Sequence, residues 1–268
     1  TNVWSTISVD RERNLVIVPT GNSSPAYYGG DREGHQDYYS SSVVALDGTT
    51  GEVVWSYQTV HHDIWDFDVP AQPTLTDVTI DGQTRAAVVQ VTKMGLTFVL
   101  DLETGEPLHP VEERPVPQTG QVPGEYLSPT QPFPLKPKPL HPLGITPDDA
   151  WGFTFWDKQK CRALLSQATT GPIYTPLTTK GTVMYPSNLG GNNWGAPAVD
   201  PERQIMITNT KRTPIQVKLV PQAECAGGEA FPQKGSPYCA EMKPLISPWG
   251  APCTKPPWAT LDAVDLSS

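Results

Sequence analysis

The chain has 268 residues, 30 of them proline and 22 glycine, and it carries a formal net charge of −9 at pH 7. This acidic balance, without a cluster of basic residues, argues against a nucleic-acid partner, and no apolar run approaches the about 20 residues that span a bilayer. Proline at this density interrupts helices and central strands, whereas 8 tryptophans and 9 tyrosines are too many aromatic residues for a disordered chain. The composition therefore predicts a loop-rich, all-β protein.

One hairpin pattern recurs along the chain. Residues 43–55 form an apolar strand, a polar turn that ends in glycine, and a second strand that ends in Trp55, and residues 98–106 repeat its first half. A related hairpin with Asp-x-Glu-Arg in its turn occurs at 8–13 and again at 198–203. We expect Gly51 and Gly105 to supply the positive φ that these turns need. An aspartate ends the first strand at each repeat, where it can bond the turn backbone, and these residues are Asp10, Asp47, Asp101, Asp200 and Asp265.

The spacing of these aspartates predicts a β-propeller. The first two gaps suit one four-stranded blade per repeat, and the two longer gaps suit a blade plus an insertion. Residues 107–147, which are rich in proline, are the expected insertion. A β-sandwich with long loops is the alternative, and we find no convincing amphipathic helix. Both ends fall within expected strands, so residues 1–268 are interpreted as one partial propeller, truncated at both ends.

The four cysteines predict two disulfides. They form no C-x-x-C pair, which argues against a structural zinc site. Cys225 and Cys239 bracket a loop rich in glycine and proline, so of the three pairings we favour 225–239 together with 161–253. Four buried free thiols are the alternative. If the disulfides form, the compartment is oxidising.

The densest polar and aromatic segment is residues 61–68. His61 and His62 could ligate zinc, but neighbouring side chains on an extended segment point to opposite faces. Asp66 and Asp68, two residues apart, can face the same way, as a hard cation such as Ca²⁺ requires. In a purely structural alternative, Asp63 and Asp66 cap turns.

Four further positions are candidates for the same site, although each also has an ordinary structural explanation. Trp4 could pack between blades, and Asn22 in Pro-Thr-Gly-Asn could be a turn residue. Lys93 could be a solvated cation after an apolar strand, and Asn193 with Trp194 could be a turn with a core anchor.

The order and spacing of these pieces resemble the dehydrogenases that depend on pyrroloquinoline quinone (PQQ), in particular their membrane-anchored glucose, quinate and shikimate branch. The resemblance runs over essentially the whole chain and is most specific at residues 59–73. The matching motifs are Trp4-Ser5-Thr6, Pro19-Thr20-Gly21-Asn22, Tyr39-Ser40-Ser41, residues 57–66, residues 70–75, Lys93 with Gly95, residues 128–133, Cys161-Arg162 and Pro252-Cys253.

The resemblance implies an eight-bladed propeller, of which the chain would supply about half, with PQQ on its axis. Trp4 would stack on the PQQ ring, and Asn193, followed by Trp194, would lie near it. Asn22 and Asp66 would ligate Ca²⁺. Asp68 occupies the position of an extra carboxylate in lanthanide-using relatives, but glucose-type members also carry it, so it does not decide the metal, and Mg²⁺ or a lanthanide is an alternative. Asp66 would also be the general base, and Lys93 would bond the quinone oxygens.

The resemblance further implies that a sugar, cyclitol or polyol is oxidised to a lactone or ketone, with ubiquinone as the electron acceptor. The parent protein would be periplasmic and held at the bacterial inner membrane by a segment outside this chain. Two alternatives remain. A non-catalytic propeller scaffold would share the repeated Asp-x-x-Thr-Gly turns, and the chain alone could be an inactive fragment that lacks part of the site.

Overall fold

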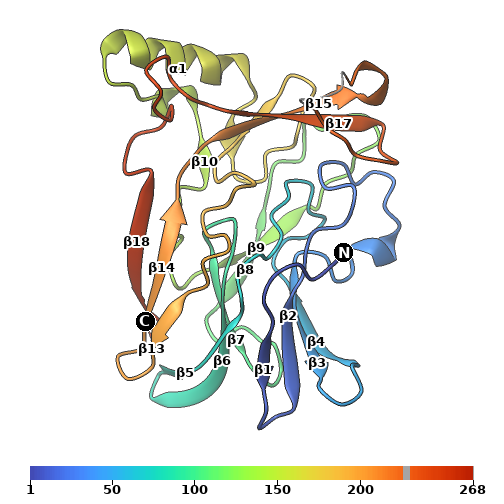
Figure 1. Ribbon diagram of the computed structural model, residues 1–268, viewed down its shortest axis with the longest axis vertical. Coiled ribbons are helices and arrows are strands. Elements are labelled where there is room, and N and C mark those ends of the chain that lie inside the picture. Colours follow the sequence, from blue (N-terminus) through green and yellow to red (C-terminus); the bar gives the residue numbers. More distant parts are fainter. Residues whose placement is uncertain (226–229, 268) are drawn as a thin grey trace.

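A computed structural model describes residues 1–225 and 230–267 of the chain and is built mainly from antiparallel strands (Figure 1). The first sheet is a meander of β1 (Ser8–Asp10), β2 (Leu15–Pro19), β3 (Ser42–Asp47) and β4 (Val53–Gln58). A second meander follows, with β5 (Thr74–Ile80), β6 (Gln83–Val91) and β7 (Thr97–Asp101). The all-β prediction is confirmed, since sequential antiparallel sheets make up most of the ordered structure.

The remaining strands pair over longer stretches of sequence. β8 (Val111–Pro115) pairs with β9 (Thr130–Pro134), and β10 (Gly144–Ile145) pairs with β11 (Gly171–Pro172). A third large sheet has the order β12 (Thr182–Met184), β15 (Ile215–Pro221), β17 (Tyr238–Pro244) and β16 (Ala230–Phe231). In a fourth, β14 (Ile205–Lys211) lies between β13 (Ala198–Asp200) and β18 (Ala259–Asp265). Short 3-10 turns occur at η1 (Gly34–Asp37), η2 (Pro147–Asp149) and η3 (Gln222–Glu224).

The repeated aspartate turns form as expected. In each of the first four, one carboxylate oxygen accepts bonds from two backbone N–H groups, for example Thr49 and Thr50 on Asp47 at 2.9 and 2.7 Å. Asp265 accepts from the N–H of Ser267 at 2.8 Å. Gly51 and Gly105 both have φ +74°, the left-handed conformation that glycine adopts without steric cost.

Trp55 connects the first two sheets. Its indole nitrogen donates to the carbonyl of Leu102 at 3.0 Å, and its ring lies against Gly105, where a Cβ atom would come within 2.5 Å of Cε3. The strand continues past Trp55 to Gln58, and this tryptophan packs against the turn of the following sheet. The largest apolar cluster continues from here through β2, β3, β6 and β7 to β15.

The sequence shows no convincing amphipathic helix, and the helix that the structure contains, α1 (Phe155–Gln167), has no apolar face that would have marked it. Thr154 caps it by accepting from the N–H of Asp157 at 3.2 Å, and the helix lies at the opposite end of the molecule from the β1–β4 turns (Figure 1). Its buried positions are Asp157, Cys161 and Leu165, so the inward face contains a carboxylate and a disulfide rather than an apolar stripe. Among the described residues no helix is both long and apolar enough to cross a bilayer.

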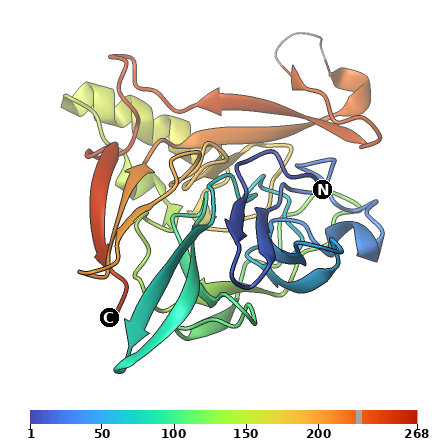
Figure 2. The same ribbon diagram turned by 60° about the horizontal axis from the view of Figure 1, so that its bottom comes forward.

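Both favoured disulfides are present, Cys161–Cys253 and Cys225–Cys239. The first joins α1 to the segment before β18 within a small apolar cluster that includes Leu165 and Leu245. Figure 2 shows the helix and the β15–β17 pair on one side of the molecule, with β1–β4 on the other.

Candidate cofactor and metal site

The segment between β4 and β5 is a buried loop. Its apolar side chains, including Ile64, Trp65 and Phe67, are at most 2% exposed and anchor it in the main core. Asp63 is fully buried, and its carboxylate accepts from the Ser41 hydroxyl at 2.6 Å and from the N–H of Trp65 at 2.9 Å. These contacts fix the loop just before the carboxylates of Asp66 and Asp68, and Phe67 anchors it between them.

Lys93 lies between the two expected site aspartates. It follows β6 in a turn closed by a 2.9 Å bond from the N–H of Gly95 to the carbonyl of Thr92. The ammonium nitrogen is 2.5 Å from Oδ1 of Asp68 and 3.2 Å from Oδ2 of Asp66, and it donates to the Asp66 carbonyl at 2.9 Å. Lys93 is 4% exposed, so it is a buried cation bound to two carboxylates and not a solvated one.

Trp4 joins the same cluster from the start of the chain. Its indole nitrogen donates to Oδ2 of Asp68 at 2.6 Å. The ring of Trp194 meets the ring of Trp4 edge to face, with centroids 5.3 Å apart. Both rings remain partly or largely exposed, at 38% for Trp4 and 74% for Trp194, and so offer aromatic surface.

The electrostatics of the cluster favour an additional cation. Burial raises the pKa of Asp66 to about 7; the charge of Lys93 opposes this shift, and the carboxylates of Asp68 and Asp63 add to it. Burial disfavours the charged form of Lys93, but the charges of Asp66 and Asp68 outweigh it and raise its pKa. When both carboxylates are ionised, they outnumber the single ammonium and leave a net negative charge, which suits a metal ion.

Asn22 is held on its own loop after β2. Its amide nitrogen donates to the carbonyl of Ala26 at 3.1 Å, and its oxygen accepts from the Ser40 hydroxyl at 3.3 Å. The loop adjoins Trp4, because a Cβ on Gly21 would come within 3.2 Å of the Trp4 ring. Asn22 is therefore placed beside the cluster through its loop.

Asn193 belongs to a loop that lies against Lys93. The N–H of Gly191 donates to the carbonyl of Lys93 at 2.7 Å, and the Asn193 amide donates to the carbonyl of Leu189 at 2.7 Å. The oxygen of Asn193 is buried without a hydrogen-bond partner. A pocket of about 300 Å³ opens here and is also lined by Leu189, Trp194, Asn209 and Lys211.

Two residues that contribute to the cluster, Tyr27 and Asn188, were not predicted from the sequence. The Tyr27 hydroxyl donates to Oδ2 of Asp66 at 3.3 Å and accepts from the amide of Asn188 at 3.0 Å. Asn188 is 8% exposed, and its oxygen has no hydrogen-bond partner. Tyr27 lies in an aromatic and glycine-rich stretch just after Asn22, which was the only available signal; Asn188 had none.

The oxygen atoms and aromatic rings of the cluster fit both groups that the resemblance implies, a hard cation such as Ca²⁺ and the planar PQQ. Carboxylate and amide oxygens are the ligands of a hard cation, and the unpaired oxygens of Asn188 and Asn193 leave acceptors near the cluster. Trp4 and Trp194 supply ring surfaces for a planar cofactor. Within the described ranges, no three His, Cys, Asp or Glu side chains form a metal cluster. His61 and His62 direct their ring nitrogens at different carboxylates and not at a common point, which disfavours the zinc alternative.

The family of the chain follows from its similarity to known proteins. The family model for the β-propeller domain of glucose/ethanol/alcohol dehydrogenases (PQQ) matches residues 1–268. The chain is 41% identical over 281 residues to the quinoprotein glucose dehydrogenase of Escherichia coli, covering 100% of this chain and 35% of that protein. It is 38% identical over 282 residues to the quinate/shikimate dehydrogenase (quinone) of Acinetobacter baylyi, with the same shares. The chain therefore belongs to the PQQ-dependent quinoprotein dehydrogenases.

The solved structures agree on the fold. The quinohemoprotein alcohol dehydrogenase of Comamonas testosteroni matches with a TM-score of 0.57 at 20% identity, covering 98% of this chain and 33% of that one. The predicted partial β-propeller is thus confirmed. The chain spans about a third of the length of the relatives it matches.

Proposed function

We propose that the protein containing this chain is a PQQ- and Ca²⁺-dependent dehydrogenase that oxidises a sugar, cyclitol or polyol to the lactone or ketone. The observation that carries the proposal is the buried cluster in which Lys93 bonds both Asp66 and Asp68 while Trp4 donates to Asp68. Family membership and similarity to glucose and quinate/shikimate dehydrogenases support the choice of substrate class.

In this function the side chains of the cluster have separate roles. PQQ, when bound, supplies the electrophilic quinone that accepts the hydrogen and two electrons of the carbinol carbon. Asp66 accepts the proton of the substrate hydroxyl as general base. Lys93 donates hydrogen bonds where negative charge develops, and Trp4, with Asn193 and Trp194 beside it, offers the surface on which the planar cofactor rests.

The metal would be held by oxygen atoms from two loops. Asp66 and Asp68 supply carboxylates from the loop before β5, and Asn22 supplies an amide oxygen from the loop after β2. A bound divalent cation polarises a carbonyl as a Lewis acid and keeps a nearby carboxylate ionised. Ca²⁺ suits this set of oxygen ligands. Mg²⁺ or a lanthanide is the alternative, and adding these ions in competition with Ca²⁺ would reveal which metal the site prefers.

The remaining parts of the proposal concern the whole protein. We place it in the periplasm, anchored in the bacterial inner membrane by a segment outside this chain, with ubiquinone as its electron acceptor. The two disulfides support an oxidising compartment. The proline-rich residues 107–147 are proposed as an insertion that carries part of the surface around the site.

The test is reconstitution of the complete protein. Cofactor-free protein, mixed with PQQ and Ca²⁺, should reduce an artificial electron acceptor with glucose, quinate or glycerol but not without PQQ. Omitting the metal, or adding a chelator before PQQ, should remove the activity. Turnover independent of PQQ, or none with any sugar, cyclitol or polyol, would refute the proposal.

A further inference from the structure

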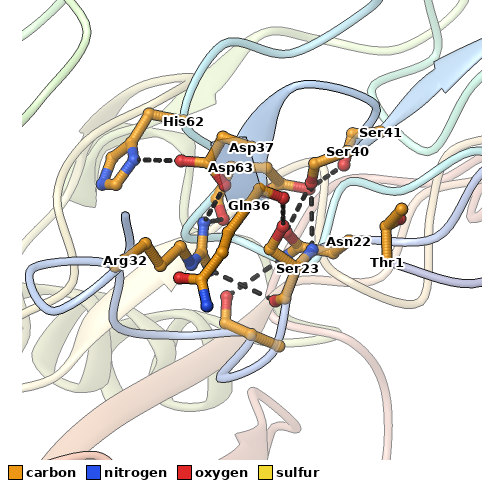
Figure 3. A network of polar contacts seen from close by, with 12 residues as sticks. Thr1, Asn22, Ser23, Arg32, Gln36, Asp37, Ser40, Ser41, His62 and Asp63 are labelled. Atoms are coloured by element: carbon orange, nitrogen blue, oxygen red, sulfur yellow. Dashed lines mark hydrogen bonds and ion pairs between the residues drawn. The ribbon is translucent and has the colours of Figure 1, made fainter. Parts of the chain in front are cut away.

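A buried histidine, His62, lies four residues before Asp66 in the same loop. His62 is 6% exposed, and its two ring nitrogens face two carboxylates, Nδ1 at 2.7 Å from Oδ2 of Asp37 and Nε2 at 3.0 Å from Oε1 of Glu125. Figure 3 shows the imidazole directed at Asp37, with the Arg32 guanidinium on the same carboxylate. Asp37 belongs to η1, His62 to the loop after β4, and Glu125 to the proline-rich segment 107–147.

The surroundings require both ring nitrogens of His62 to donate. Glu125 already accepts from the N–H of Gly29 at 2.7 Å and from the N–H of Tyr126 at 3.0 Å, one on each oxygen, so it acts as an acceptor throughout. Asp37 likewise accepts from Arg32 at 3.1 Å. A neutral imidazole has one N–H and would set a lone pair against a carboxylate, so the imidazolium form fits the site.

The direction of the pKa shifts agrees with this charge state. Burial disfavours the charged form of His62, but hydrogen bonds and charges of Asp37 and Glu125 outweigh it and raise its pKa. For Asp37, burial is likewise outweighed, by the bond from His62 and the charge of Arg32, and its pKa is lowered. Tyr126 also faces the ring, stacked on it with centroids 3.6 Å apart, and the Arg32 guanidinium lies on the same Asp37 carboxylate.

The ring is fitted tightly between backbones. A Cβ atom on Gly29 would come within 2.3 Å of Cε1 of His62, so only glycine allows the chain to pass there. A Cβ on the next residue, Gly30, would come within 2.2 Å of the carbonyl of Gly124. The imidazole therefore lies where three separate segments meet, and Gly29 leaves no room for a side chain beside it.

The network reaches the segment that carries the site carboxylates. Arg32 donates to the carbonyl of Asp63 at 2.9 Å as well as to Asp37, and Asp63 caps the N–H of Trp65. Asp66, three residues after Asp63, has φ +59°, a conformation that non-glycine residues adopt only when their surroundings hold them there. The bonds around His62 are thus part of what fixes residues 63–66.

We propose that His62 is a positioning residue whose imidazole, held between Asp37 and Glu125, fixes the backbone of residues 63–68 and so orients the carboxylates of Asp66 and Asp68. The roles of those carboxylates rest on the proposed function; the fixing of the loop does not. Residues that orient metal ligands through a second layer of bonds typically change metal affinity or activity by about 10- to 100-fold when removed.

The chain offers a matched control in the adjacent histidine. His61 also bonds a carboxylate of segment 107–147, with Nε2 at 3.1 Å from Oε1 of Glu113, but its side chain is 34% exposed and that of Glu113 is 51% exposed. An exposed pair of this kind contributes little. His61→Gln therefore removes a similar link at the surface without disturbing the buried network.

The experiment compares His62→Gln with His61→Gln in the complete protein. In the cofactor-free state, hydrogen exchange of residues 62–68 and 122–126 should become faster in His62→Gln, while the β1–β2 hairpin exchanges as in wild type. After reconstitution, the Ca²⁺ concentration for half-maximal activity should rise by about tenfold or more and kcat should fall by about tenfold or more. The KM for the sugar should stay within about twofold, and His61→Gln should match wild type throughout.

A lower melting temperature alone, with wild-type exchange in residues 62–68 and a wild-type Ca²⁺ requirement, would overturn the proposal, because a merely structural role predicts it. If His62→Gln does not fold, Glu125→Gln carries the test, since it keeps the imidazole and its bond to Asp37; the same changes are expected, and wild-type behaviour overturns the proposal. If the wild-type protein shows no PQQ-dependent turnover, the proposed function fails, while the exchange comparison still decides the role of His62.

Discussion

Asp66 combines two conditions that each cost free energy. It is in the left-handed region at φ +59°, and its half-buried carboxylate, 27% exposed, lies near the carboxylates of Asp68 and Asp63, so that desolvation and these charges raise its pKa to about 7. A left-handed non-glycine residue alone costs about 1–3 kcal/mol. Lys93 offsets part of this by donating to both the carboxylate and the carbonyl of Asp66. Strain of this kind persists where the surrounding structure supports it, as at sites of binding or catalysis.

The charge of His62 predicts a pH dependence of stability. Its folded-state pKa is raised above the unfolded value of about 6.5. A raised histidine pKa stabilises the fold fully below about pH 6.5, and this stabilisation is lost as the pH rises through the folded-state value. The stability advantage of wild type over His62→Gln should therefore be large near pH 6.5, about 3 kcal/mol for a broken buried pair, and should shrink towards alkaline pH.

Urea unfolding of cofactor-free protein between pH 6.5 and 9.5 measures this difference. His61→Gln is the control and should cost less than about 1 kcal/mol at every pH, because its ion pair is exposed. An advantage that stays constant over this range would show that His62 is not held as an imidazolium.

At the scale of elements, the turns were the most predictable part of the fold. Each depends on a local rule, an aspartate that accepts backbone bonds two and three residues later and a glycine with positive φ, so residues 47–51 and 101–105 contain all the information required. The helix α1 could not be predicted in the same way. Its buried positions are spaced as in a helix, but Asp157 and Cys161 are two of the three, while Phe155 and Trp156 are exposed.

Alanine substitutions at Gly51 and Gly105 distinguish the cost of backbone strain from the cost of overpacking. Gly51 and Gly105 have the same φ of +74°, but a Cβ on Gly51 would meet nothing within 4 Å, whereas on Gly105 it would lie 2.5 Å from the Trp55 ring. Gly51→Ala should cost about 1–2 kcal/mol for the left-handed conformation. Gly105→Ala should cost about 1–3 kcal/mol more, because overpacking adds to the strain. Equal shifts of the urea midpoint would contradict the packing of Trp55 between the two sheets.

At the scale of the whole molecule, the site is assembled from loops that are distant in sequence. The bond between Trp4 and Asp68 joins residues 64 apart, and the Lys93–Asp66 bond joins residues 27 apart. No local rule predicts such contacts; the motif order of the family pointed to Trp4, Asp66, Asp68 and Lys93, and the structure brings these four together. Tyr27, Asn188 and the partners of His62 could not be predicted, because their bonds reach up to 161 residues along the chain.

The most direct test of the proposed chemistry is the turnover of Asp66→Asn in the complete, reconstituted protein, measured by dye reduction beside a PQQ titration. Asparagine keeps the shape and one ligand oxygen but cannot accept a proton at neutral pH, so turnover should fall by at least about two to four orders of magnitude, and excess Ca²⁺ should not restore it. PQQ should still bind, since Trp4 and Lys93 remain. Lys93→Ala should differ, with weaker PQQ binding and slower but measurable turnover. Near-normal turnover of Asp66→Asn would contradict the account and point to Asp68 or Asp63 as the base.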